Sequence, residues 1–206
     1  MSNDRLLLAR RGSGSGVAFV VTGPSGAGKT SVINRVMEQL PNLVFSVSHT
    51  TRSKREQEVD GAAYVFVTED EFAGLVDAGE FVEHTIYSGA RYGTTRTQLE
   101  AGFRCGNDVI LNVEVEGAKS LRRTGFGEHP IVYVFLAPST LARLAERLRA
   151  RGTEIEAKID ERIAVAAHEM EETGSFDYLV INDSLDEAVD ELRSIIIAER
   201  LRIANR

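Results

Sequence analysis

The segment Gly23-Pro24-Ser25-Gly26-Ala27-Gly28-Lys29-Thr30 has the residue types and the spacing needed to hold phosphate groups. It fits the phosphate-loop pattern G-x-x-x-x-G-K-[ST] at every required position. The glycines allow successive backbone N–H groups to turn toward a phosphate without Cβ clashes. Lys29 adds a mobile positive charge for the β- and γ-phosphates, and the Thr30 hydroxyl can ligate Mg²⁺. The sequence therefore predicts binding of a nucleoside triphosphate.

The elements on either side suit this loop. An apolar run at 17–21 predicts a strand that leads into it, and a helix over about 30–40 points the positive end of its dipole at the anion. Further apolar runs, several of them continuous, predict strands buried on both faces at 43–47, 109–113, 131–136 and 178–181. Between them the patterns predict helices at about 95–103, 117–123, 139–150, 156–172 and 185–203. Ser139 is the predicted N-cap of the helix over 139–150, and Ser184 or Asp183 caps the last one. This alternation is typical of a doubly wound α/β fold with a parallel sheet.

The region from 48 to 94 breaks the alternation and predicts a small mixed insert. Strands are expected at 64–67 and 81–86, with a short helix between them that starts at a capping box formed by Thr68 and Glu71. The insert also holds Arg52 and Arg55, whose planar guanidinium groups match a phosphate. Tyrosine hydroxyls could join the arginines around a monophosphate, and a carboxylate could accept hydrogen bonds from a base edge. These residues predict a second, acceptor-side site.

Composition narrows the class of protein. The chain has 206 residues, enough for one α/β domain with inserted parts, and a hydrophobic fraction of 43%. Its net charge of −7 argues against a general nucleic-acid binder, and no apolar run is long enough to span a bilayer. Residues 1–16 lack the apolar region of a signal peptide and are expected to form a flexible tail. The single cysteine, Cys105, suits a reducing cytoplasm.

From about Val17 to its last helix, the chain resembles the guanylate kinases, which transfer a phosphoryl group from ATP to GMP. The resemblance rests on an ordered series of motifs: G-P-S-G-A-G-K-T at 23–30, S-x-x-T-R-x-x-R at 48–55, G-x-x-Y at 61–64, F-x-E ending at Glu83, Y-G-T at 92–94, E-x-x-G at 114–117, R-L-x-x-R-G-T at 147–153 and I-N-D at 181–183. It implies a phosphate-loop core over 17–47, 95–143 and 165–206. A GMP-binding insert over 48–94 and a helical lid over 144–164 would complete the domain of residues 17–206.

The resemblance also implies roles for individual residues. ATP would be bound by Gly23, Ser25, Gly26, Ala27, Gly28, Lys29, Thr30, Ser31 and Asn182. The GMP phosphate would be held by Ser48, Arg52, Arg55, Tyr64 and Tyr92, and guanine would be read by Glu83, Thr94 and Glu114. Lys29, Arg147, Arg151 and Arg162 would act on the transferring phosphoryl group, with Mg²⁺ at Thr30. The implied protein is a cytoplasmic enzyme of purine metabolism whose partners are ATP and GMP rather than nucleic acid or membrane; the sequence makes no prediction of its oligomeric state.

The chain departs from the family pattern at three places. Asn112 stands where the family usually has an acidic residue, Glu116 replaces a usual Gln, and Ala90-Arg91 replaces a polar and aromatic pair. Two other functions stay open at this point. One is a related phosphate-loop kinase with another acceptor, such as a ribose bisphosphate, which would give Glu83 and Glu114 no base to read. The other is a guanylate-kinase-like binding module with weak or no catalysis, for which Asn112 is the only argument.

Overall fold

The central element of the fold is a parallel five-stranded sheet. The structure is a computed structural model, which describes residues 16–56, 58–62, 64–150 and 156–202. The strand order is β2-β7-β1-β8-β9, and all four neighbouring pairs are parallel. The strands are β1 (Ala18–Thr22), β2 (Leu43–Ser46), β7 (Asp108–Asn112), β8 (Ile131–Ala137) and β9 (Tyr178–Ile181). All five lie where the apolar runs predict them.

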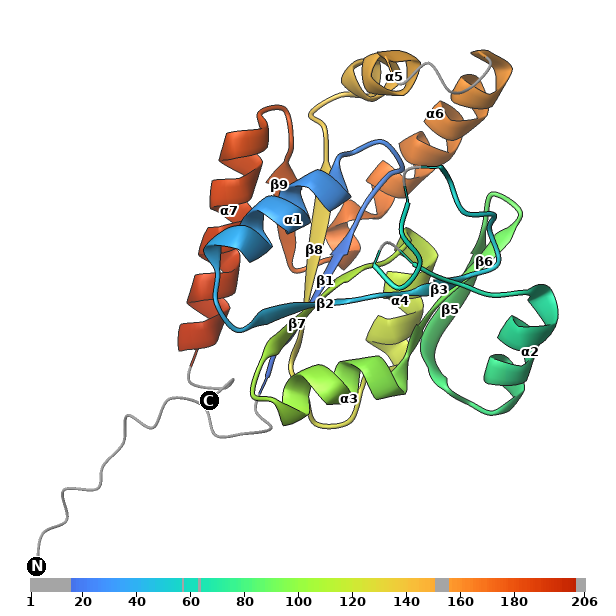
Figure 1. The fold of residues 1–206 in the computed structure, drawn as a ribbon. Helices are drawn as coiled ribbons and strands as arrows, with labels where there is room; N and C mark the ends of the chain where they lie inside the picture. The colour runs from blue at the N-terminus through green and yellow to red at the C-terminus, as the bar shows by residue number, and fades with distance from the viewer. Residues whose placement is uncertain (1–15, 57, 63, 151–155, 203–206) are drawn as a thin grey trace, which may run out of the picture.

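Helices cover both faces of this sheet (Figure 1). They are α1 (Lys29–Gln39), α3 (Arg96–Arg104), α4 (Val115–Thr124) and α7 (Leu185–Leu201). Within β1, Phe19 and Val21 pack on the side of α1 and α7, whereas Ala18 and Val20 pack on the side of α3 and α4. Every residue of β1 is buried, which agrees with the unbroken apolar run of its first four residues. The prediction of a doubly wound α/β fold is confirmed.

Strand β1 lies between β7 and β8; the chain passes from β1 toward β2 on one side of it, and later crosses from β7 to β8 on the other side. In sheets of this type the crevice at the carboxyl ends of the strands, at such a switch point, is where ligands bind. The loop of residues 23–28 leaves β1 there, and the segments after β7 and β9 end at the same edge.

A second, four-stranded sheet has the order β4-β3-β6-β5. It contains β3 (His49–Thr50), β4 (Val65–Phe66), β5 (Phe81–Tyr87) and β6 (Ala90–Thr95), with α2 (Glu69–Asp77) between β4 and β5. The expected capping box is present, since Thr68 and Glu71 bond each other reciprocally at the start of α2. The sequence did not predict β3 or β6. The turn that joins β5 to β6 carries positive φ at Ser88 (49°) and Gly89 (78°), as the tight turns of two-residue hairpins require.

Helices α5 (Leu141–Ala150) and α6 (Glu156–Glu171) pack against each other through Leu144, Leu148, Ile159 and Ala166. A short 3₁₀ helix (Glu172–Ser175) follows α6. The expected N-cap of α5 is wrong by one residue, because the Thr140 hydroxyl accepts a hydrogen bond from the Arg143 N–H at 3.3 Å and the Ser139 N–H instead donates to Asp183. At α7 the Ser184 hydroxyl is the cap, as expected. No helix in the described part of the chain is both long enough and apolar enough to cross a membrane.

A buried ion pair ties together the edge of the sheet opposite the phosphate loop. The Asp108 carboxylate accepts from the Val17 N–H at 2.8 Å and from Nε of Arg200 at 2.7 Å. Nη2 of Arg200 also donates to the Pro41 carbonyl at 2.9 Å. The start of β1, the start of β7, the turn before β2 and the end of α7 are therefore joined by one charged pair.

We expect Arg200→Met to lower the free energy of unfolding by about 3 kcal/mol, because the buried Asp108 carboxylate loses the charge that neutralises it. The matched control is Arg35→Met, which removes an ion pair to Asp186 whose two side chains are 48% and 84% exposed. That control should change stability by less than about 1 kcal/mol. Urea unfolding measures both, and equal losses would show that the Asp108–Arg200 pair does not hold this edge together.

Candidate active site

The phosphate loop runs from the end of β1 into α1. Lys29, the first residue of α1, is 8% exposed, and its Nζ donates to the carbonyl oxygens of Gly23 at 2.5 Å and Pro24 at 3.2 Å. The lysine thus lies back along its own loop. Thr30 and Ser31 follow it on the exposed side of the first helical turn.

Two side chains support this loop: Asn182, which follows β9, and Arg147 on α5. Nδ2 of Asn182 donates to the Ala27 carbonyl at 2.7 Å, and Nη1 of Arg147 donates to the same oxygen at 3.2 Å. Nη2 of Arg147 also donates to the Asn182 carbonyl at 2.5 Å. Gly28 has a φ of +92°, and a Cβ there would lie 2.4 Å from Nδ2 of Asn182. The loop, Asn182 and Arg147 therefore form one packed unit in which only glycine fits at position 28.

A hollow lies between the second sheet and the end of β7. It is lined by Ser48, Tyr64, Glu83, Thr85, Tyr92, Asn112, Val113 and Glu114. Five of these are among the residues that the sequence analysis assigned to an acceptor, and they come from segments far apart in the chain. Strands β5 and β6 of the second sheet hold Glu83 and Tyr92, Ser48 and Tyr64 directly precede β3 and β4, and Glu114 lies between β7 and α4.

Glu83 is the most deeply buried ionisable group in this hollow, with 4% of the residue exposed. Its Oε1 accepts from the Thr94 hydroxyl at 2.6 Å, and that hydroxyl lies 3.3 Å from the hydroxyl of Ser48. Its Oε2 is buried with no hydrogen-bond partner among the described residues. Loss of water raises the pKa of Glu83 to about 7, and the charge of Glu114 adds to this, while the hydrogen bonds from Thr94 oppose it.

Glu114 resembles Glu83 in one respect: its Oε2 is also buried without a partner among the described residues. Burial, followed by the charge of Glu114, raises the pKa of Tyr64 to about 12, so the phenol keeps its proton as a donor. Buried polar atoms without partners are rare in folded proteins, and each one needs an explanation. Two carboxylate oxygens that lack donors suit a ligand that brings its own N–H groups.

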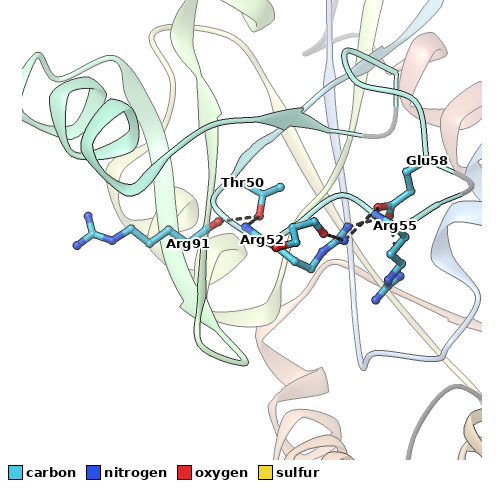
Figure 2. Close-up of polar contacts among 6 residues, drawn as sticks. Thr50, Arg52, Arg55, Glu58 and Arg91 are labelled. Atoms are coloured by element: carbon cyan, nitrogen blue, oxygen red, sulfur yellow. Dashed lines mark hydrogen bonds and ion pairs between the residues drawn. The ribbon is translucent and has the colours of Figure 1, made fainter.

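Arg52 and Arg55 of the insert both contact the carboxylate of Glu58 (Figure 2). Arg52 forms a bidentate pair with Glu58, with Nη1–Oε2 and Nη2–Oε1 distances of 3.0 and 2.8 Å. Its guanidinium lies 5.4 Å from the ring centroid of Tyr64 and within electrostatic range of Tyr92. The Arg55 side chain is 63% exposed, and its Nη1 is 4.0 Å from Oε1 of Glu58. The Arg52 guanidinium thus lies beside Tyr64, one of the lining tyrosines, where its charge suits an anion.

One of the two remaining predicted arginines, Arg162, lies on α6. Arg162 lies within electrostatic range of Tyr87, and Tyr87 in turn lies near the Ser25 side chain of the phosphate loop. Arg151 lies outside the described residues.

Three residues of this region were missed by sequence reasoning: Glu58, Tyr87 and Glu169. Glu58 follows Arg55 at the same three-residue spacing that separates the two arginines, a signal that could have revealed it. Tyr87 and Glu169 carry no local signal.

Glu169 lies on α6, within range of the charge on Lys29. Burial raises its pKa to about 7; the positive charge of Lys29 opposes this shift, and the charges of Glu114 and Glu116 add to it. The edge of the sheet therefore offers a phosphate loop with a lysine, a nearby hollow with arginines and unpaired carboxylate oxygens, and buried acids between them. This arrangement is suited to bringing a polyphosphate and a second, N–H-rich anion together.

Comparison with known proteins agrees with this arrangement. The family model described as guanylate kinase matches residues 15–199. The guanylate kinase of Thermotoga maritima is 44% identical over 188 residues, covering 91% of this chain and 89% of that protein. The guanylate kinase of Desulfitobacterium hafniense is 38% identical, covering 93% and 94%. A crystal structure of guanylate kinase from Anaplasma phagocytophilum superposes with a TM-score of 0.77 at 31% identity, covering 93% and 89%. The chain belongs to the guanylate kinase family.

Proposed function

We propose that this enzyme transfers the γ-phosphoryl group of ATP to GMP and releases ADP and GDP. Family membership supports the activity, and one observation supports the acceptor. That observation is the pair of buried carboxylates, Glu83 and Glu114, each with an oxygen that has no donor among the described residues. Guanine presents an N1–H and an N2 amino group on one edge, whereas adenine presents an acceptor at N1. The hollow thus suits guanine.

In this proposal the acceptor lies between the base-reading and phosphate-binding ends of the insert of residues 48–94. Glu83, Thr94 and Glu114 bind the base. The phosphate meets hydroxyls and guanidinium groups from Ser48, Arg52, Arg55, Tyr64 and Tyr92. The proximity of Arg52 to the Tyr64 ring and to Tyr92 supports this division, because it puts the positive charge at the tyrosine side of the hollow.

The donor lies on the phosphate loop of the core of residues 17–47, 95–143 and 165–206. Backbone N–H groups of the loop and the Lys29 ammonium bind its phosphates, and Asn182 lies on the adenine side. Arg147, Arg151 and Arg162 belong to the lid of residues 144–164 and act on the transferring group. Phosphoryl transfer needs positioning and charge neutralisation more than covalent chemistry. Closure would also exclude the water that otherwise hydrolyses ATP.

Mg²⁺ fits the donor side of this site. Mg²⁺ is typically bound through one or two protein oxygens together with substrate phosphates and water. The described residues contain no cluster of three or more acidic, histidine or cysteine side chains that could hold a metal alone, which agrees with that mode. The exposed Thr30 hydroxyl would hold it, with the Asn112 amide at the end of β7 as a neutral neighbour. The ion would neutralise charge on the phosphates.

The alternative functions have less support. A ribose bisphosphate acceptor would leave the buried oxygens of Glu83 and Glu114 without donors. A binding module would have no use for a lysine and threonine held in a complete phosphate loop. The single cysteine, Cys105, is a free thiol, which supports assignment to the reducing cytoplasm.

An acceptor panel tests the proposed function. ADP formation from Mg·ATP is measured with GMP, AMP, CMP, UMP and a ribose bisphosphate in turn. We expect turnover with GMP alone, because only guanine among these bases has two adjacent donors for the carboxylates. Lys29→Ala should reduce that turnover by at least about a hundredfold, because it removes charge from the transferring group. Turnover with AMP or a ribose bisphosphate, or none with GMP, would contradict the proposal.

Arg52→Ala tests the position of the acceptor phosphate. We expect the KM for GMP to rise by more than about tenfold, since hydrogen bonds to charged groups contribute roughly 1.5–3 kcal/mol. The KM for ATP should change by less than about twofold. Arg104→Ala, at an exposed position at the end of α3, is the control and should change neither. Equal weakening of GMP and ATP would separate Arg52 from the acceptor site.

A further inference from the structure

Glu58 is a carboxylate inside a group of side chains suited to binding an anion. Its two oxygens accept from both Nη atoms of Arg52, and Oε2 also accepts from the Arg55 N–H at 2.8 Å. The side chains of Arg52 and Glu58 are only 19% and 17% exposed. A negative charge so close to a proposed phosphate site repels the phosphate. The Glu58 carboxylate therefore needs a role that compensates for this repulsion.

The backbone holds Glu58 in place. Its own N–H donates to the Arg55 carbonyl at 3.1 Å, while its carboxylate accepts from the Arg55 N–H. These reciprocal bonds join Arg55 and Glu58, so the carboxylate cannot swing away without losing its bond to the Arg55 N–H. Thr50 anchors the other end of the segment, since its hydroxyl donates to the Arg91 carbonyl at 2.9 Å and accepts from the Arg52 N–H at 3.2 Å (Figure 2).

The bonds to Glu58 decide which edge of Arg52 remains available. A guanidinium has five N–H donors in a rigid plane. Glu58 takes one from each Nη, and the Ser53 carbonyl takes another from Nη1 at 2.7 Å. The plane lies near the rings of Tyr64 and Phe66, at 5.4 and 5.6 Å from their centroids. The remaining donors belong to Nε and Nη2.

The pair stays charged at neutral pH. Burial alone would raise the pKa of Glu58, but the hydrogen bonds from Arg52 and from the Arg55 N–H outweigh it and lower that pKa. Burial alone would lower the pKa of Arg52, but the hydrogen bond and the charge of Glu58 outweigh burial and raise that pKa. The ion pair is therefore a fixed part of the site.

We propose that Glu58 is a positioning residue of the acceptor site, which holds the Arg52 guanidinium in one orientation so that its remaining N–H donors meet the GMP phosphate. The inference rests on the proposed function. Pre-organisation of this kind favours binding because the arginine does not lose side-chain freedom when the ligand arrives. In the alternative role, the Glu58 carboxylate occupies the place of the phosphate on Arg52 and must be displaced by it. Glu58 would then compete with GMP.

The test compares Glu58→Gln with Glu56→Gln, an exposed glutamate two residues earlier that serves as the charge-matched control. Dissociation constants are measured by calorimetry for GMP and for guanosine, which lacks the phosphate. We expect Glu58→Gln to weaken GMP binding by about tenfold and to leave guanosine binding within twofold of the parent protein. Glu56→Gln should change neither. In an Arg52→Ala background, Glu58→Gln should have less than a twofold further effect, because it acts through Arg52.

Three results would overturn the inference. Tighter GMP binding by Glu58→Gln would identify a competing anion, and an unchanged affinity would show that Arg52 needs no partner. Equal losses for GMP and guanosine would indicate a general disturbance of the insert. Melting curves check folding, and Glu58→Asp replaces Glu58→Gln in the same comparisons if the latter does not fold. Failure of the proposed function is separate from these, since the parent protein would then bind neither GMP nor guanosine.

Discussion

The hollow is governed by two carboxylate oxygens, one each from Glu83 and Glu114, that the fold buries without giving them donors among the described residues. Glu83 comes from the second sheet and Glu114 from the end of β7, so the hollow exists only where the two sheets meet. A Cβ on Gly117 would lie 2.4 Å from Oε2 of Glu83, which shows how closely α4 approaches this carboxylate. Burial without donors is unfavourable in the free protein. In the proposed acceptor site the two N–H groups of guanine relieve this cost, so selectivity for guanine would follow from the structure of the insert.

The architecture of the main sheet was predictable because its strands are buried on both faces. Continuous apolar runs such as 17–21 admit few other interpretations, and the capping box at Thr68 and Glu71 is a purely local signal. Strands β3 and β6 were missed for the opposite reason. β3 has only two residues, and β6 contains Gly93, where a Cβ would meet the Phe81 ring at 2.8 Å. Its glycine makes room for a side chain of β5, a tertiary fact that no local pattern reveals.

In the candidate site too, local motifs could be predicted from the sequence and tertiary contacts could not. Residues in a contiguous motif, such as the phosphate loop, could be assigned together from the sequence, and the resemblance supplied the scattered ones. The contacts of each side chain could not be predicted. Arg147 bonds main-chain oxygens of Ala27 and Asn182, which depends on how α5 packs over the loop. Glu58 was overlooked because an acid next to two arginines is usually a solvated charge. Only its burial and its bidentate geometry distinguish it.

The most direct test of the role of Glu83 is the proton balance of GMP binding. With a pKa of about 7 in the free protein, Glu83 is about half protonated at pH 7, and donors from guanine favour its ionised form. Calorimetry at pH 7 in buffers of different ionisation enthalpy should show that the parent protein releases about half a proton more per GMP than Glu83→Gln does. GMP affinity should correspondingly rise from pH 6 to pH 8. An identical proton balance in the two proteins would contradict the claim that a buried carboxylate at position 83 reads the base.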